Sequence, residues 1–169
     1  GHGPLSHIYE DVLSKYRKRT HEDVSRWLIQ NTVLKDIISA AGYSPAEISE
    51  LSVGRLTSGR SKLLNQVISG HFDGDIMDYL VRDSHHTGVE YGYVDVERLL
   101  GSIVVVDDTL AMNVNAMAAL ESFYIARYMM FKAVYFHKTV RAAEIMASKA
   151  MDIANDALGL TSFKTPEEF

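Results

Sequence analysis

One stretch decides how this chain folds: Asp-Ile-Met-Asp-Tyr-Leu-Val-Arg-Asp-Ser-His-His-Thr-Gly, residues 75–88. Asp75, Tyr79 and Asp83 are spaced four residues apart, so on a helix they share one face. The apolar residues take the other face: Ile76, Met77, Leu80 and Val81. Gly88 follows where a C-cap glycine belongs. The stretch therefore predicts an amphipathic helix that ends at Gly88.

The polar face of this helix has two interpretations. A row with two carboxylates and a phenol, with His86 close by, can line a functional site. The same row can also be a solvated outer face, with Asp78 and Arg82 as an exposed i,i+4 ion pair. Spacing alone leaves both interpretations open.

Composition sets limits on the function. The chain has 169 residues, of which 47% are hydrophobic, and this fits one domain with a buried core. Its net charge of −5 argues against stable nucleic-acid binding, which needs a broad basic face. With no cysteine, disulfides and thiolate metal sites are excluded. No signal peptide or membrane-spanning run is found, so we expect a cytoplasmic protein without membrane contact.

The rest of the chain reads as mostly helical. Ser44-Pro45-Ala46-Glu47 is a strong start signal, and Thr20 is a candidate N-cap. The stretch from Gly54 to Arg60 has few apolar residues and predicts a loop. We expect helices near Leu5, from His21 to about Ala41, from Pro45, from Lys62 to Ile68, and from Asp95 to Leu100.

One segment departs from the helical pattern. β-Branched residues flank an acidic turn at Asp107-Asp108-Thr109, and this predicts a hairpin between Ile103 and Val114. The following stretch, Ala116 to Leu158, contains neither glycine nor proline and is long for one globular helix, so we expect a kink or break in it. The fold class is therefore mainly α, with one small β-hairpin.

Two other places carry candidate chemistry. His7 and Glu10 lie three residues apart, so they meet on one helical turn, although surface histidines often bond only to backbone. Arg127 interrupts an apolar stripe formed by Leu120, Phe123, Tyr124, Phe131 and Val134. A buried cation is costly unless it is paired. Arg127 could therefore pair with an acid of the residue 75–88 helix, or bind a phosphate.

Three blocks resemble HD-domain phosphohydrolases. Gly-His-Gly-Pro-Leu-Ser-His, residues 1–7, resembles the segment after that family's His-Asp pair. Residues 73–88 look like its last metal motif, and Tyr-Phe-His-Lys-Thr-Val-Arg-Ala-Ala-Glu, residues 135–144, is similar to a third block. The blocks occur in the family's order and span nearly the whole chain. They are closest to the branch that includes deoxynucleoside triphosphate triphosphohydrolases.

The resemblance implies an HD-domain-like helical bundle and a role for each matching residue. Asp75 matches a metal ligand. His7 matches a proposed general acid, Glu10 its acidic partner, and His21 a further catalytic-site histidine near the phosphates. The substrate-binding positions are His2, Tyr79, Asp83, Arg127 and Tyr135, of which Arg127 would bind the terminal phosphate.

The chain also departs from the family pattern. Of the family's metal ligands only Asp75 is present, and the others would precede Gly1. Together with Thr-Pro-Glu-Glu, residues 165–168, which opens a helix just before the chain stops, this leads us to expect one HD-type domain, residues 1–169, incomplete at both ends. Such a chain would be inactive alone. Ile76 stands where relatives usually carry a basic residue, which removes one expected phosphate contact.

The resemblance implies a metal-dependent phosphohydrolase that acts on nucleotides, with deoxynucleoside triphosphates as the first candidates and a homo-oligomer as the expected assembly. The metal would be Mg, Mn, Fe, Ni or Zn. Two alternatives stay open: hydrolysis of a nucleotide monophosphate or cyclic phosphodiester, and a non-catalytic nucleotide-binding regulatory module.

Overall fold

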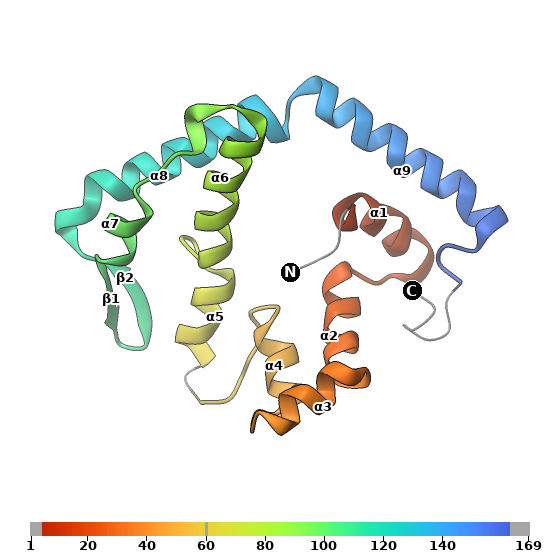
Figure 1. Ribbon diagram of the computed structural model, residues 1–169, viewed down its shortest axis with the longest axis horizontal. Helices are drawn as coiled ribbons and strands as arrows, with labels where there is room; N and C mark the ends of the chain where they lie inside the picture. The colour runs from red at the N-terminus through yellow and green to blue at the C-terminus, as the bar shows by residue number, and fades with distance from the viewer. Residues whose placement is uncertain (1–4, 60, 163–169) are drawn as a thin grey trace. The chain divides into compact units, whose positions relative to one another are not determined.

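The computed structural model describes residues 5–59 and 61–162. These residues form two compact units (Figure 1). The first unit comprises the described residues up to Val53 and from Arg141 onward, and the second comprises Gly54–Val140. The expectation of a single domain stays a prediction. His2 and the predicted helix start at residues 165–168 lie outside the described residues.

The first unit consists of helices whose starts follow the expected capping signals. Thr20 accepts a hydrogen bond from the Asp23 backbone N–H, and the Asp23 carboxylate caps the Thr20 N–H in return. Ser44 likewise accepts from the Glu47 N–H. The helices are α1 (Ser6–Arg17), α2 (His21–Asn31), α3 (Val33–Ala40), α4 (Pro45–Leu51) and the part of α9 (Lys138–Leu158) from Arg141 onward.

The prediction of one helix from His21 to about Ala41 is wrong. The backbone at Thr32 is extended, with φ −116° and ψ −173°, and this ends α2 and starts α3. The Thr32 hydroxyl donates to the Leu28 carbonyl at 2.7 Å and accepts from the Leu34 N–H at 3.3 Å. One threonine side chain therefore satisfies backbone groups on both sides of the break.

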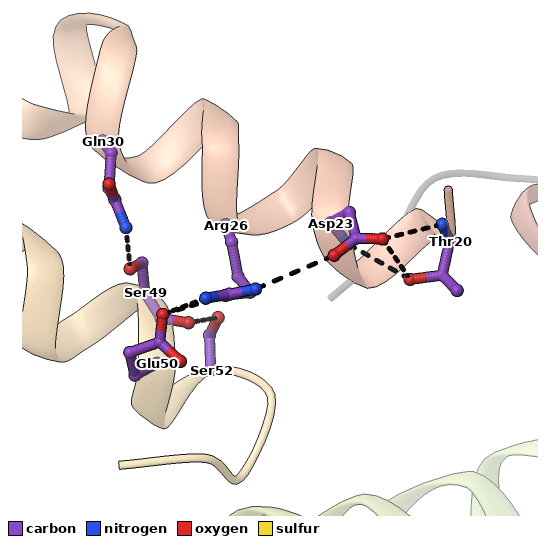
Figure 2. A network of polar contacts seen from close by, with 7 residues as sticks. All are labelled: Thr20, Asp23, Arg26, Gln30, Ser49, Glu50 and Ser52. Carbon is purple, nitrogen blue, oxygen red and sulfur yellow. Dashed lines mark hydrogen bonds and ion pairs between the residues drawn. The ribbon is translucent and has the colours of Figure 1, made fainter. Parts of the chain in front are cut away.

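A polar network connects α2 with α4 (Figure 2). The Arg26 guanidinium donates to the Glu50 carboxylate, with its Nε at 3.1 Å, and lies 3.7 Å from the Asp23 carboxylate. The Gln30 amide donates to the hydroxyl of Ser49, which is fully buried. Because these polar groups have partners, they are not left unsatisfied between the two helices.

Helix α1 forms a hydrogen bond and an ion pair with the C-terminal part of the same unit. The Tyr9 hydroxyl donates to the Leu160 carbonyl at 2.7 Å, and the Lys15 ammonium lies 2.7 Å from the Asp152 carboxylate. Val12 and Leu13 on α1 are almost fully buried. These contacts hold the first turns of α1, where His7 and Glu10 lie, against the rest of the unit.

The second unit is centred on helix α6 (Gly74–Thr87), as the residue 75–88 pattern predicts. Asp73 caps its start by accepting from the Ile76 N–H at 2.8 Å, and Gly88 ends it with φ 70°. The other elements are α5 (Ser61–Ser69), the 3₁₀ turn η1 (Glu90–Gly92), α7 (Val96–Leu100), β1 (Ile103–Val106), β2 (Thr109–Met112), η2 (Val114–Ala116), α8 (Met117–Met130) and the π-helical turn η3 (Phe131–Tyr135).

The predicted β-hairpin is confirmed. β1 and β2 pair antiparallel, with Ile103 opposite Met112 and Val106 opposite Thr109. Asp107 and Asp108 form the two-residue turn and both have positive φ, 50° and 54°. This is the signature of a type I′ turn, whose twist matches that of the strands. Aspartate tolerates the left-handed region better than most residues.

The core of the second unit forms on the apolar face of α6. Ile76, Met77 and Leu80 are buried, and they pack into a cluster with Leu99, Phe123 and Met130. Across the described residues the fold is mainly α with one small hairpin, as expected. No helix in that part of the chain combines the length and the apolar character needed to span a membrane.

The expected break in the long C-terminal helical stretch is also confirmed. Helix α8 ends at Met130, and the π-helical turn follows it. There the Phe136 N–H donates to the Phe131 carbonyl at 2.7 Å, an i→i−5 bond. Helical structure resumes at Lys138 as α9. The π-helical turn changes the direction of the side chains around Tyr135 relative to a continuous α-helix.

Turn η1 packs so closely on α6 that only glycine fits at its end. The Gly92 N–H donates to the buried Ser84 hydroxyl at 2.8 Å. A Cβ on Gly92 would meet the Leu80 carbonyl oxygen at 2.3 Å and the Ser84 hydroxyl oxygen at 2.4 Å. Backbone has to move to relieve the first contact.

We therefore expect Gly92→Ala to destabilise the protein by about 2 kcal/mol, the cost typical of overpacking. The matched control is Gly74→Ala at the start of α6, where the added Cβ has its nearest neighbour at 3.9 Å. This control should change stability by less than about 0.5 kcal/mol. Urea unfolding monitored by circular dichroism measures both values. Equal stabilities for the two variants would show that η1 does not pack on α6 as described.

Candidate functional site

Four of the predicted substrate-binding side chains lie together in the second unit. Tyr79 and Asp83 come from the polar face of α6, Arg127 from α8, and Tyr135 from the π-helical turn. Each of them is half-buried. With Phe131 they form what we call the arginine–tyrosine cluster. The structure thus gathers a cation, a carboxylate and two phenols at one place.

A hydrogen bond joins α6 to the π-helical turn. The Tyr135 hydroxyl donates to the Asp83 carboxylate at 2.7 Å. Burial and this hydrogen bond both raise the pKa of Tyr135 well above its ordinary value, because the carboxylate disfavours a phenolate beside it. Tyr135 therefore stays protonated at neutral pH and orients the carboxylate.

Aromatic contacts surround Arg127. Its guanidinium lies 5.8 Å from the centre of the Phe131 ring and hydrogen-bonds to the Tyr79 phenol. The Tyr79 ring meets Tyr135 edge-on at 5.9 Å, and Phe131 meets Tyr135 at 5.0 Å. Burial raises the pKa of Tyr79, and the Arg127 cation opposes part of that shift. Both aromatic partners are neutral, and the guanidinium also interacts electrostatically with the buried Asp73 carboxylate.

Asp75 lies at the exposed start of α6, one turn before Tyr79. Burial raises the pKa of its neighbour Asp73, and the Asp75 carboxylate adds to the shift. The solvated-face interpretation holds for part of the helix, because Arg82 and Asp78 form an exposed pair at 2.8 Å. It does not describe Tyr79 and Asp83, which contact side chains of other elements. The polar row therefore has an exposed part and a packed part.

The predicted catalytic residues of the first unit also lie together. The Glu10 carboxylate accepts from the His21 backbone N–H at 3.2 Å and contacts the His21 ring Nδ1. The rings of His7 and His21 meet edge-on at 4.9 Å. We call these three residues the histidine cluster. Burial alone would raise the pKa of Glu10, but the hydrogen bonds from His21 outweigh it and lower that pKa.

Two features of these clusters were not predicted. The contact of Glu10 with His21, at the start of the next helix, was not expected. The ligand atoms of His7, Glu10 and His21 all lie within 4.8 Å of one another, and the partnership of Glu10 with His7 stays a prediction. Phe131 was counted only as a member of the apolar stripe. Its spacing, four residues after Arg127 and four before Tyr135, was the available signal that all three share one face.

Comparisons with known proteins agree with this architecture. A family model described as the HD associated region matches residues 94–165. The deoxynucleoside triphosphate triphosphohydrolase SAMHD1 homolog of Dictyostelium discoideum is 29% identical over 180 residues, a match that covers 100% of this chain and 34% of that protein. A crystal structure of a phosphohydrolase from Bacteroides thetaiotaomicron superposes with a TM-score of 0.74 at 29% identity, covering 92% of this chain and 36% of that one.

The chain belongs to the HD-domain phosphohydrolase superfamily. The Bacillus subtilis protein YwfO is a further relative, 35% identical over 156 residues, which cover 89% of this chain and 34% of YwfO. The chain thus spans about a third of the length of the curated relatives named here. Membership of the superfamily agrees with the resemblance found in the three sequence blocks.

The Tyr135–Asp83 bond gives a test of the arginine–tyrosine cluster. Tyr135→Phe removes the hydroxyl and leaves a half-buried carboxylate with one partner fewer, so it should cost about 1 kcal/mol of stability at pH 7. Tyr128→Phe is the matched control, because Tyr128 lies on α8 and is 63% exposed. It should have little effect. Urea unfolding measures both, and equal effects would contradict the described bond.

The Tyr135–Asp83 hydrogen bond also predicts how the stability of the protein depends on pH. The pKa of Tyr135 is raised above the ordinary value of 10.0. The contribution of the protonated Tyr135 hydroxyl to stability is therefore fully present below about pH 10. This contribution is lost as the pH rises further towards the pKa of Tyr135 in the folded state. The stability difference between the wild-type protein and Tyr135→Phe should shrink above pH 10. A constant difference up to the alkaline limit of folding would contradict the shift.

Proposed function

We propose that the protein hydrolyses nucleotides, with deoxynucleoside triphosphates as its substrates. The observation that carries this proposal is the arginine–tyrosine cluster. It places the Arg127 guanidinium, which contacts the Phe131 ring and the Tyr79 phenol, beside the Tyr135–Asp83 pair. Such a site can recognise an anionic group and a hydroxyl group of one molecule. The name of the Dictyostelium discoideum relative, a deoxynucleoside triphosphate triphosphohydrolase, supports the same class.

In this proposal Arg127 binds the phosphates. A guanidinium presents a planar set of donors that matches phosphate oxygens two at a time. Phe131 and Tyr79 both contact the Arg127 guanidinium and restrict its side chain. Little conformational freedom of Arg127 is therefore lost when a phosphate binds. Preorganised donors of this kind stabilise charge that develops on phosphate oxygens during hydrolysis.

The remaining polar groups of the cluster suit a sugar. The Asp83 carboxylate can accept a hydrogen bond from a sugar hydroxyl while it still accepts one from Tyr135. The rings of Tyr79 and Tyr135 meet edge-on and offer an apolar surface to the carbon face of a ribose. We propose that these three residues orient the nucleoside.

The histidine cluster supplies proton transfer in this proposal. Histidine is the side chain best suited to donate a proton to a leaving oxygen near neutral pH. His7 is the exposed member of the cluster and takes that role. Glu10 is held ionised by His21, so it can stabilise the imidazolium forms beside it. His21 keeps the carboxylate in place. The proposal assigns His2 to the phosphates from sequence alone.

The metal of the family does not fit this chain by itself. Among the described residues, Asp75 belongs to no group of three close metal-ligating side chains. One carboxylate does not hold a catalytic ion, which needs about three protein ligands. In the proposal Asp75 is one of several ligands of a metal site in the whole protein, and the ion held there would supply an activated water for the attack.

One observation favours a second candidate, a nucleotide with fewer phosphates. Ile76 is 6% exposed and packs in the core of the second unit. It occupies the position where the family resemblance expects a basic side chain, so α6 gives no cationic contact there. A substrate panel of deoxynucleoside tri-, di- and monophosphates and cyclic nucleotides distinguishes the two candidates.

The proposal predicts opposite results for two arginine variants of the whole protein. Arg127→Ala should lower kcat/KM for deoxynucleoside triphosphates by about 100-fold or more, because charge on the phosphates loses its donor. Arg82→Ala is the matched control, since Arg82 forms an exposed pair with Asp78, and it should stay within about two-fold of wild type. Phosphate-release assays measure both. Equal activity of the two variants would reject Arg127 as the phosphate ligand.

A second prediction concerns Asp75. In the whole protein, Asp75→Ala should lose both the catalytic metal and turnover with little change in stability, because Asp75 is exposed and makes no core contact. The 169-residue chain alone should hydrolyse no nucleotide. Metal analysis of the purified proteins and phosphate release measure these outcomes. Full activity of Asp75→Ala would reject Asp75 as a metal ligand, and turnover by the chain alone would reject the proposed site.

A further inference from the structure

The histidine cluster has the composition and spacing of a transition-metal site. His7, Glu10 and His21 each offer one ligand atom, and these atoms all lie within 4.8 Å of one another. Two imidazoles and one carboxylate are a ligand set typical of zinc. Among the described residues, this is the only group of three or more such side chains. Small rotations about the side-chain bonds would bring all three atoms onto one ion.

Local structure keeps the ligands in place. His7 and Glu10 lie one turn apart on α1, and His21 is the first residue of α2. The Glu10 carboxylate is fixed by the His21 backbone N–H at 3.2 Å, and it already contacts the His21 ring. A bound ion would replace that contact with two coordination bonds.

The cluster is open to solvent on one side. His7 is exposed, and it lines a cleft of about 340 Å³ between α1 and α9 of the same unit, together with Asp11 and Ser148. An ion can therefore reach the ligands, and water can occupy the remaining coordination positions. Three protein ligands with an open position are the usual arrangement of a metal site that exchanges its ligands.

We propose that His7, Glu10 and His21 form a binding site for a zinc-class divalent ion, and that this ion inhibits the enzyme. Coordination uses the lone pair of one ring nitrogen of each histidine, so the nitrogen of His7 that binds the ion can no longer carry a proton to a leaving group. The inhibitory part rests on the proposed function, whereas the binding part does not.

Binding is tested on the 169-residue chain without any activity measurement. Zn²⁺ is titrated by calorimetry into the wild-type chain and into His7→Ala, Glu10→Gln and His21→Ala. His71→Ala is the matched control, an exposed histidine of the second unit. Each ligand variant should bind Zn²⁺ at least about 10-fold more weakly, while His71→Ala binds as wild type does. Equal affinity in all four variants would overturn the proposal.

Co²⁺ gives a readout that does not depend on the folding of variants. Added to the wild-type chain, it should show the visible ligand-field absorption of a site with few ligands, and Zn²⁺ should abolish it. A spectrum identical to that of Co²⁺ in buffer would overturn the site. In the whole protein already loaded with its catalytic metal, added Zn²⁺ should lower turnover in wild type and His71→Ala alike, with a midpoint that matches the Kd of the histidine cluster measured by calorimetry. Zn²⁺ that binds the cluster without slowing turnover would overturn the inhibitory part alone.

Discussion

Burial of one face of α6 is the constraint on which the second unit depends. Ile76, Met77 and Leu80 are all less than 10% exposed, and each contributes roughly 2 kcal/mol by leaving water. Their burial fixes the rotation of the helix about its axis. Tyr79 and Asp83 are then directed towards α8 and the π-helical turn. The same three apolar side chains therefore stabilise the unit and orient the polar row.

The π-helical turn completes the arrangement that α6 begins. Arg127, Phe131 and Tyr135 follow one another at four-residue intervals. Arg127 lies on α8, and the turn begins at Phe131 and ends at Tyr135. The aromatic contacts and the Tyr135–Asp83 bond all converge here. In a π-helical turn the backbone N–H bonds to the carbonyl five residues earlier instead of four, and such turns occur often at functional sites. Here the irregular backbone coincides with the residues that we propose to bind the nucleotide.

The sequence predicted the elements whose signals are local. The α6 pattern, its Gly88 cap, the Thr20 and Ser44 caps and the hairpin around Asp107 were all found as expected, because capping and turn chemistry act within a few residues. The break at Thr32 was missed, since the apolar spacing runs through it and the competing threonine hydrogen bonds are not visible in the pattern. The contact of Glu10 with His21 was missed for a different reason: it joins two helices across a turn.

The roles of the site residues are supported to different degrees. The structure brings Tyr79, Asp83, Arg127 and Tyr135 into contact in the second unit, and it brings His7, Glu10 and His21 together in the first unit. Of the family's metal ligands, only Asp75 has a matching position in this sequence, so the sequence predicts no other ligand of that site.

Identification of the phosphate product by ³¹P NMR tests the central claim most directly. The whole protein is incubated with a deoxynucleoside triphosphate and each candidate metal, and the products are followed without a coupled enzyme. The account predicts inorganic triphosphate and a free deoxynucleoside, formed in a metal-dependent reaction. Unchanged substrate with every metal, or release of single phosphates only, would contradict it.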